Sequence, residues 1–454
     1  MSAIESAIHL TPVGLIRPGG EFEAIAGACG QNIVALSKGR EQKTRLRPDD
    51  IHALKTLLRR EPCVPVPDSV LEAASQQGRS RLWQGVHDRG EEFMFMDLPL
   101  AEGDMELMAD HFPARLQLIS IPDLRLGAGE LLDVTSHPSE WQVGEREELY
   151  TVLNIGRCVL AEGARIQVQG NVLSMLVQEM LVSPGSAAGV TRDNAHIAIL
   201  PTPFPVDSSM TGPADGPQGS DGDHGGNGRD GVDCRVVGTT LGPMLKSTPS
   251  GIQRSGESGS HGGNGGEGRK GRTGGMCKRA HITVRSFAGG SSVLRVYAKT
   301  GDGGRGGDGG RGGDGGHGGR AGTGAPQLEP PVAGGAPGRG GDGGRGGDGG
   351  NGGRGGISSV IHISCPPEHE SLVRTFAEQG SGGDAGRGGQ GGCPGEAGDV
   401  APASAMVVLQ TGKAGVDGAQ GRAGRARPAP AIYVNWKTVN TTNKDNRGNQ
   451  HASY

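Results

Sequence analysis

Residues 301–319 read GDGGRGGDGGRGGDGGHGG, and this stretch decides how the second half of the chain folds. Glycine fills two of every three positions, and the remaining position carries mostly Asp and Arg in alternation. A period of three is that of the polyproline II conformation, which makes no internal hydrogen bonds. A bare glycine face lets a second backbone come close enough for main-chain groups to pair between segments. The stretch therefore predicts a packed bundle of polyglycine II helices.

Six glycine runs keep this register, which a random glycine-rich linker would not do. They span 216–231, 256–274, 301–322, 335–356, 380–398 and 412–424. The third and fourth runs are of the G-G-x type with two bare faces, whereas the first and sixth are mostly G-x-y with one. We expect the third and fourth runs to be central and the first and sixth to be peripheral. A collagen-like trimer and a disordered tail are the alternatives, although the central runs lack collagen's prolines.

The amino-acid composition limits how large an apolar core the chain can form and which classes of partner it can bind. Of 454 residues, 87 are glycine, only 3% are aromatic and 33% are apolar, too few for one ordinary core along the whole length. The net charge of −4 predicts no nucleic-acid partner. No apolar stretch of membrane-spanning length and no signal peptide are present, so we expect cytoplasmic synthesis, with particle association or an unrecognised export route left open.

The cysteines indicate neither a metal site nor a disulfide framework. All seven are scattered, and none forms a C-x-x-C pair. They are Cys29, Cys63, Cys158, Cys234, Cys277, Cys365 and Cys393. We expect no metal and no cofactor.

The chain divides into four predicted parts. Residues 1–115 read as a small α+β docking domain, and 116–205 as a β-rich, solenoid-like platform with a β-sandwich as the alternative. Residues 206–430 form the polyglycine II bundle with intervening strands, and 431–454 form a polar, flexible tail. The predicted fold class is thus mostly β with a polyproline II/polyglycine II bundle.

Two helices are predicted near the start of the chain. Asp49 or Asp50 can cap a helix whose apolar positions recur at helical spacing until Pro62 stops it. The second follows Asp68 and ends near Gly78.

Strands are predicted from short apolar runs and from alternation. Ala164, Ile166 and Val168 alternate with polar residues, which indicates a half-buried strand. Further strands are expected at Leu10–Ile16, 116–126, 150–178 and 196–203. The segments HITVRSF, SVLRVYAK, ISSVIHISC and AMVVLQT between glycine runs are also rich in β-branched residues.

The interrupted G-G-x runs resemble the glycine-rich antifreeze proteins and the tips of phage tail-fibre adhesins. Their alternation with strands is similar to the Obg domain of Obg GTPases, and bacterial collagen-like proteins look similar over a wider span. The resemblance covers about residues 215–425 and is architectural. The chain has no G-x-x-x-x-G-K-[ST] loop, so GTPase activity is not implied.

Charged residues alternate in sign along the central runs, and this face is the predicted binding surface. They are Asp302, Arg305, Asp308, Arg311, Asp314, Arg339, Asp342, Arg345 and Asp348. The simpler interpretation of this pattern is a solvated face with ion pairs along each run. The functional interpretation is a charge-matched face through which two copies of the protein associate. RNA binding is disfavoured because the central runs contain no aromatic residue.

The function predicted from the sequence is non-catalytic: stiff display, adhesion or assembly toward a protein or glycan surface. The alternatives are a polysaccharide-acting enzyme on the β-rich middle and an ice-binding protein. Catalytic candidates are weak. Asp133, Ser136 and His137 lie close in sequence, as do Asp193 and His196, and Asp123 and Glu162 are further carboxylates. Proximity in sequence alone does not make a triad.

Overall fold

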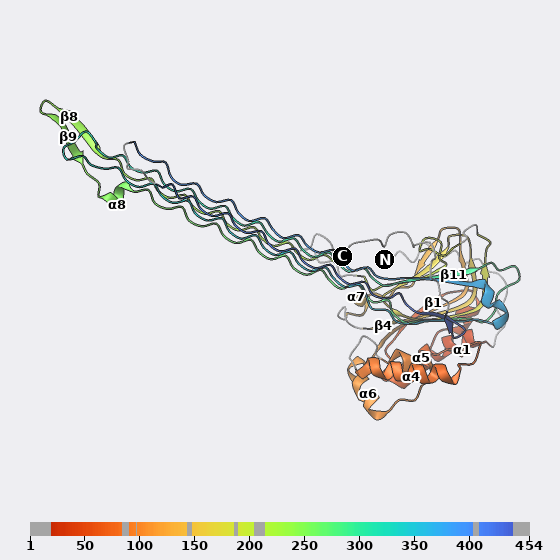
Figure 1. The fold of residues 1–454 in the computed structure, drawn as a ribbon. Coiled ribbons are helices and arrows are strands. Elements are labelled where there is room, and N and C mark those ends of the chain that lie inside the picture. The colour runs from red at the N-terminus through yellow and green to blue at the C-terminus, as the bar shows by residue number, and fades with distance from the viewer. Residues whose placement is uncertain are drawn as a thin grey trace.

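The structure is a computed structural model that describes residues 20–83, 90–96, 98–142, 148–185, 189–203, 214–402 and 408–438. Two sheets and a layer of helices form a body, and a long arm projects from it (Figure 1). The strand predicted at Leu10–Ile16 and the tail beyond residue 438 lie outside the described residues.

The larger sheet has eight strands in the order β1-β2-β4-β6-β10-β12-β14-β15. All neighbours from β2 to β14 are parallel, and β1 and β15 pair antiparallel at the two edges. The strands are β1 (Gln42–Leu46), β2 (Arg115–Leu126), β4 (Leu149–Leu160), β6 (Val172–Val182), β10 (Ala280–Val284), β12 (Ile361–Ser364), β14 (Ile432–Val434) and β15 (Lys437–Thr438).

The smaller sheet has five parallel strands in the order β13-β11-β7-β5-β3. They are β3 (Leu131–Asp133), β5 (Arg165–Gln169), β7 (Ile197–Leu200), β11 (Leu294–Lys299) and β13 (Val373–Glu378). From β2 to β14, apart from the separate hairpin β8–β9, successive strands alternate between the two sheets. Side chains from both, such as Ile155 and Ile282 of the larger and Ile166 and Val296 of the smaller, share one buried apolar cluster.

Helices cover the other face of the larger sheet. Leu54, Leu58 and Phe93 pack there against Leu118 and Val152 in a second buried cluster. The helical segments of this layer are α1 (Glu21–Ala28), α2 (Ile33–Ser37), α3 (Ile51–Leu58), α4 (Asp68–Trp83), α5 (Glu91–Met96), α6 (Glu102–Met108) and the 3₁₀ turn η1 (Ala109–His111). Short turns elsewhere are α7 (Pro138–Trp141) and η2 (Pro367–Leu372).

The six glycine runs form the projecting part, here called the glycine arm and defined as residues 214–275, 301–356, 380–402 and 408–427 (Figure 1). Its segments are extended and lie side by side, joined by main-chain hydrogen bonds between runs. In chain order, the run pairs lie between β7 and β10, between β11 and β12, and between β13 and β14. Each pair is therefore inserted between a strand of the smaller sheet and a strand of the larger one.

The fold class predicted from the sequence is wrong. The structure is a mixed α/β fold with an eight-stranded and a five-stranded sheet, rather than a mostly β chain with a polyglycine II bundle and a separate solenoid or sandwich middle. Within the described residues, the glycine triplets carry no assigned helix or strand. The three-residue period suggested helices with their own regular structure. The regular structure instead comes from short strands that pair across long stretches of sequence.

Local predictions fared better than the fold class. Helix α3 (Ile51–Leu58) is capped by Asp50, whose carboxylate accepts a hydrogen bond from Ala53 N, as predicted. Helix α4 begins at Asp68 as expected but continues to Trp83, beyond Gly78. The alternating segment is β5, and three of the four segments between runs contain β10, β11 and β12. In the fourth, the described residues 408–411 carry no strand.

Candidate binding surface of the glycine arm

The third glycine run is the centre of the arm. Main-chain hydrogen bonds join it to the first, second, fourth and fifth runs, for example Gly219 N to Asp308 O, Gly310 N to Gly266 O, Gly347 N to Gly310 O and Gly309 N to Arg387 O, each 2.8–2.9 Å. The fourth run likewise bonds to the second, third, fifth and sixth. The prediction that these two runs are central is confirmed, since only segments with two bare faces can accept neighbours on both sides.

Close approach of the backbones leaves no room for side chains at the glycines that face a neighbour. A Cβ placed on Gly310 would lie 1.9 Å from Ser220 O, and one on Gly309 would lie 2.0 Å from Gly347 O. The carbonyl oxygen occupies the position of the missing side chain, so only a hydrogen atom fits there. The two glycines of each central triplet are therefore required by contact on two sides.

The predicted charged residues have defined partners inside the arm. The expected ion pairs are present at spacing i, i+3: Arg305–Asp308 (2.6 Å), Arg311–Asp314 (2.9 Å), Arg339–Asp342 (3.2 Å) and Arg345–Asp348 (2.7 Å). The aspartates also accept main-chain N–H groups of an adjacent run, from Ser381 to Asp302, Arg387 to Asp308, Cys393 to Asp314, Lys413 to Asp342 and Ala419 to Asp348, at 2.7–2.9 Å. Their role as an external binding face stays a prediction.

Side chains of Asn and His play the same role as Asp, which sequence reasoning missed. His224 Nδ1 accepts a hydrogen bond from Asp314 N (3.0 Å), and Asn227 Oδ1 accepts one from His317 N (2.9 Å). The shared feature is a short side chain with an acceptor at the variable position of a triplet. This acceptor pairs with a main-chain N–H of the adjacent run that no glycine pair satisfies. An extended segment offers no partner within itself for that N–H. The only signal in the sequence was the recurrence of Asp, Asn and His at these positions.

Asp308 shows how such a hydrogen bond between runs stabilises the ionised form of the side chain. The N–H of Arg387 stabilises the ionised carboxylate, which lowers the pKa of Asp308 below its usual value, and the guanidinium of Arg305 acts in the same direction. A folded-state pKa below the unfolded one means that this stabilisation is present at neutral pH. It is fully present above the ordinary pKa of Asp, about 4, and is lost as the pH falls below that value through the lowered pKa of the folded state.

We expect Asp308→Ala to weaken the pairing of the third and fifth runs by about 0.5–1 kcal/mol, because Arg387 N loses its acceptor at a partly solvated site. Asp308→Asn keeps the acceptor and should cost less, with no loss on acidification arising from this position. Amide exchange of residues 380–398, corrected for the intrinsic rate, at pH 7 and at a pH well below the ordinary Asp pKa of about 4 measures both. Equal exchange in the Ala and Asn variants would contradict the assignment.

The end of the arm farthest from the body is an exposed apolar surface, here called the distal tip. The hairpin β8 (Arg235–Thr239) and β9 (Gly242–Ser247) and the short helix α8 (Gly251–Arg254) lie there (Figure 1). Leu241 at the hairpin turn is 93% exposed and Ile252 is 89% exposed. The remaining exposed apolar side chains of the hairpin and of the neighbouring run ends are Val232, Val237, Met244, Val400, Val408 and Leu409.

Polar contacts hold the distal tip to the arm. Asp233 accepts a hydrogen bond from Thr323 N (2.7 Å) and pairs with Arg320 (3.2 Å). The Thr323 N–H, together with Arg320, lowers the pKa of Asp233 to about 2. Helix α8 is closed by a capping box in which Ser250 and Gln253 exchange side-chain hydrogen bonds. The exposed apolar side chains therefore stand on backbone that is fixed to the rest of the arm.

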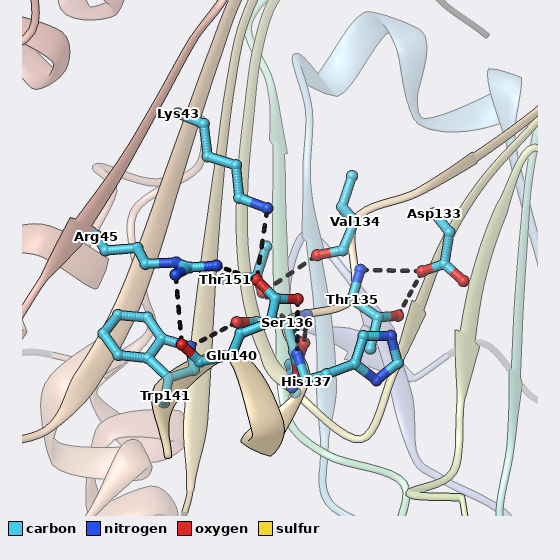
Figure 2. A network of polar contacts seen from close by, with 11 residues as sticks. Lys43, Arg45, Asp133, Val134, Thr135, Ser136, His137, Glu140, Trp141 and Thr151 are labelled. Atoms are coloured by element: carbon cyan, nitrogen blue, oxygen red, sulfur yellow. Dashed lines mark hydrogen bonds and ion pairs between the residues drawn. The ribbon is translucent and has the colours of Figure 1, made fainter. Parts of the chain in front are cut away.

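The catalytic candidates Asp133, Ser136 and His137 do not form a triad (Figure 2). Asp133 accepts hydrogen bonds from Thr135 and Gln167, and Ser136 Oγ accepts one from the indole of Trp141 (2.7 Å). Among the described residues, no hydrogen bond joins the side chains of the three candidates. These contacts are structural. In the same network Glu140 caps α7 and forms ion pairs with Arg45 and Lys43.

The other catalytic candidates also have structural contacts. His196 is buried, and its Nδ1 accepts a hydrogen bond from Arg295 N (3.1 Å). Burial, together with the charge of Arg295, lowers the pKa of His196 to about 4, so the ring is neutral at pH 7. Asp123 forms an ion pair with Arg125 (3.0 Å). Asp193 is an exposed residue of the turn before β7, and Glu162 precedes β5.

Two further features concern metals and membranes. In the part of the chain that the structure describes, no three His, Cys, Asp or Glu side chains are grouped as metal ligands. The helices described are all too short or too polar to cross a bilayer.

Comparison with known proteins gives little guidance. No protein-family model and no curated protein matches the chain. Among solved structures, a weak similarity is to the nine polyproline type II helical bundle springtail antifreeze protein from Granisotoma rainieri, with 22% identity. It covers 44% of this chain and 99% of that one, and the TM-score is 0.07. A likeness at that TM-score carries no argument about fold or function, so the chain is assigned to no family.

Proposed function

We propose that this protein is a non-catalytic binding protein that uses the glycine arm to hold an apolar tip away from its body. The observation that carries the proposal is that the distal tip carries exposed aliphatic side chains, of which Leu241 and Ile252 are almost fully exposed. Soluble proteins seldom expose such a surface unless it meets a partner. The body, by contrast, exposes single large apolar residues such as Val34 and Trp83.

The arm suits display because its pairing resists bending. The central run alone is joined to four neighbours, and the spacing of its glycine contacts is fixed by main-chain carbonyls. An extended run of 22 residues such as 335–356 reaches at most about 75 Å. A tip fixed on such a support loses little conformational freedom on binding, and this preorganisation favours affinity.

The chemistry of the tip favours a protein partner with an apolar surface. The tip segments 232–254 and 400–411 contain Leu, Ile, Val and Met but no Trp, Tyr or Phe. Aliphatic side chains gain binding energy by removing apolar area from water, at about 25 cal/mol per Å². Their partner must offer an apolar surface of its own, which a protein does more readily than a glycan.

A photo-crosslinking experiment tests the proposal. We expect a benzoylphenylalanine at position 241 of the full chain, expressed in the cells that make it, to give one discrete protein adduct. The matched control places the same group at position 34, where the native Val34 is also exposed but lies on the body. Ile252→Asp in the position-241 chain should abolish the adduct, because a charge enters the apolar patch. Adducts of equal yield from both positions, or none from position 241, would overturn the proposal.

A further inference from the structure

An open cleft crosses the helical layer of the body, far in sequence from the glycine arm. It has a volume of about 670 Å³ and lies between the segment that follows α3 and the segment that follows α5. Its wall is largely apolar, formed by Pro62, Val66, Leu71, Met96 and Leu98, with Glu61 and Glu72 at its border. Nothing in the proposed display function uses this cleft.

A small chamber adjoins the cleft, and here it is called the inner chamber. It has a volume of about 60 Å³ and shares Pro62, Val66 and Met96 with the cleft. Its floor is the larger sheet, where parallel pairing places His281 beside His362 and Thr283 beside Ser364. A volume of this size accommodates a small anion or a few waters.

Two polar groups of the inner chamber are buried without a partner. His362 is 7% exposed, and its Nδ1 has no hydrogen-bond partner among the described residues. The buried Nε of Arg60 has none either. An unsatisfied buried polar atom costs about 1–3 kcal/mol, so two at one cavity call for a ligand or for water.

The charge of Arg60 is only partly compensated. Its terminal nitrogens donate only to the carbonyl oxygens of Arg59 (2.6 Å) and Leu57 (2.8 Å). The carboxylate of Glu21 partly offsets this charge, but Glu21 is shared with Arg285, with which it forms an ion pair (2.6 Å). Burial lowers the pKa of Arg60 to about 10, which still leaves the guanidinium charged at pH 7. The chamber is therefore lined by two arginines, two imidazoles and two hydroxyls.

We propose that the inner chamber binds the oxyanion head of a small amphiphilic molecule whose apolar chain lies in the adjoining cleft. The head is a carboxylate or a phosphate monoester, because both present acceptor oxygens to Arg60, His362 and Thr283. The chain packs along Val66, Leu71 and Leu98. Burial lowers the pKa of His362 well below its usual range, so the neutral ring supplies a hydrogen bond rather than a charge.

Titration calorimetry on the full chain tests this with four probes: acetate, octanoate, inorganic phosphate and octyl phosphate. We expect an octyl compound to bind at least tenfold more tightly than its short counterpart, because only it fills the cleft. The head group is then identified by which of octanoate and octyl phosphate binds more tightly. Absence of binding by all four, or equal affinity for long and short probes, would overturn the proposal.

Variants separate the chamber from general charge effects. Arg60→Gln and His362→Gln should each weaken the octyl probe at least tenfold, whereas Arg40→Gln, at an exposed position outside both cavities, should leave binding unchanged. Thermal unfolding of each variant shows whether it folds, and Arg60→Gln should fold because it removes a buried charge that is only partly compensated. Undiminished binding by both chamber variants would sink the assignment. Crosslinking from position 241 is independent of these results, so either proposal can fail alone.

Discussion

Gly313→Ala is expected to open the glycine arm while the body stays folded. A Cβ at this position would lie 1.9 Å from Asp223 O, so the first and third runs must separate. Gly313 N also donates to Gly263 O of the second run (2.8 Å), and its carbonyl accepts from Gly344 N of the fourth run (2.8 Å). Displacing a run that is bonded on several sides costs about 3 kcal/mol, as overpacking of a dense core does. Hydrogen exchange of amides in 216–231 and 301–322 should rise well above that of β4.

The matched control is Gly226→Ala, which lies in the first run. The nearest atom to its Cβ would be Ser260 Oγ at 3.7 Å, an ordinary contact. The chemical change is the same, so backbone entropy and propensity effects are shared between the two variants. Exchange in the arm should then stay as in the unsubstituted chain. If both variants exchange alike, contact between glycine faces does not hold the arm together.

The contrast between Gly313 and Gly226 shows how much a sequence reveals about such an arm. The register of the glycines is visible as a pattern, and G-G-x composition correctly placed the third and fourth runs at the centre. The pattern also implied side-by-side extended segments with main-chain pairing. Gly226 lies outside the three-residue register of its run, whereas Gly225 is in register and its Cβ would lie 2.1 Å from Ser260 O. The register therefore separates contact glycines from the others, but it does not show which neighbouring run supplies the carbonyl.

The sheets were harder to predict because their pairing is non-local. Strands β10 and β12 have five and four residues, and the third and fourth glycine runs separate them in the chain. Strand β10 pairs with β6, and β12 pairs with β10, which buries Ile282 and Ile363 in the same core as Ile155. Sequence reasoning expected these segments to be strands at the ends or side of the glycine bundle, and it did not place them in one sheet with β6. Helix α3, by contrast, was predicted correctly because a cap and apolar spacing are local.

Of the two candidate surfaces, the sequence predicted the charged residues of the central runs and did not predict the apolar distal tip. The charged residues of the central runs were found as a pattern, but the N–H groups that they satisfy belong to runs about 70–80 residues away. The apolar distal tip could not be recognised from β8 and β9, because short apolar pairs such as Val236-Val237 and Met244-Leu245 show no periodicity that indicates whether they are exposed. Only their place at the end of the arm leaves Leu241 and Ile252 exposed.

Attachment of the arm explains why the body needs both sheets. Each pair of runs begins after a strand of the five-stranded sheet and ends at a strand of the eight-stranded one. The glycines next to the body join this framework directly: Gly380 N donates to the hydroxyl of Thr300 (2.5 Å), at the end of β11. A force on the distal tip is therefore carried into two hydrogen-bonded sheets rather than into one loop.

Arg279→Met is expected to cost about 3–5 kcal/mol of folding stability, because it leaves Glu92 as a buried charge without its partner. Arg279 is 1% exposed and forms an ion pair with Glu92, which is 3% exposed. Arg279 precedes β10 and Glu92 lies on α5, so the pair joins the helical layer to the larger sheet. Chemical denaturation followed by circular dichroism measures the loss.

The double variant Glu92→Met/Arg279→Met decides whether the loss comes from the stranded charge or from packing. Replacing both partners by apolar residues of similar volume removes the cost of burying a lone carboxylate, so most of the stability should return. Lys437→Met provides the control for an exposed pair: Lys437 is 71% exposed in its side chain beside Glu370, and its loss should cost under about 1 kcal/mol. If the double variant is no more stable than Arg279→Met, the buried pair contributes through its shape rather than its charge, and the helical layer is held to the sheet by packing of the apolar cluster around Phe93 and Leu118.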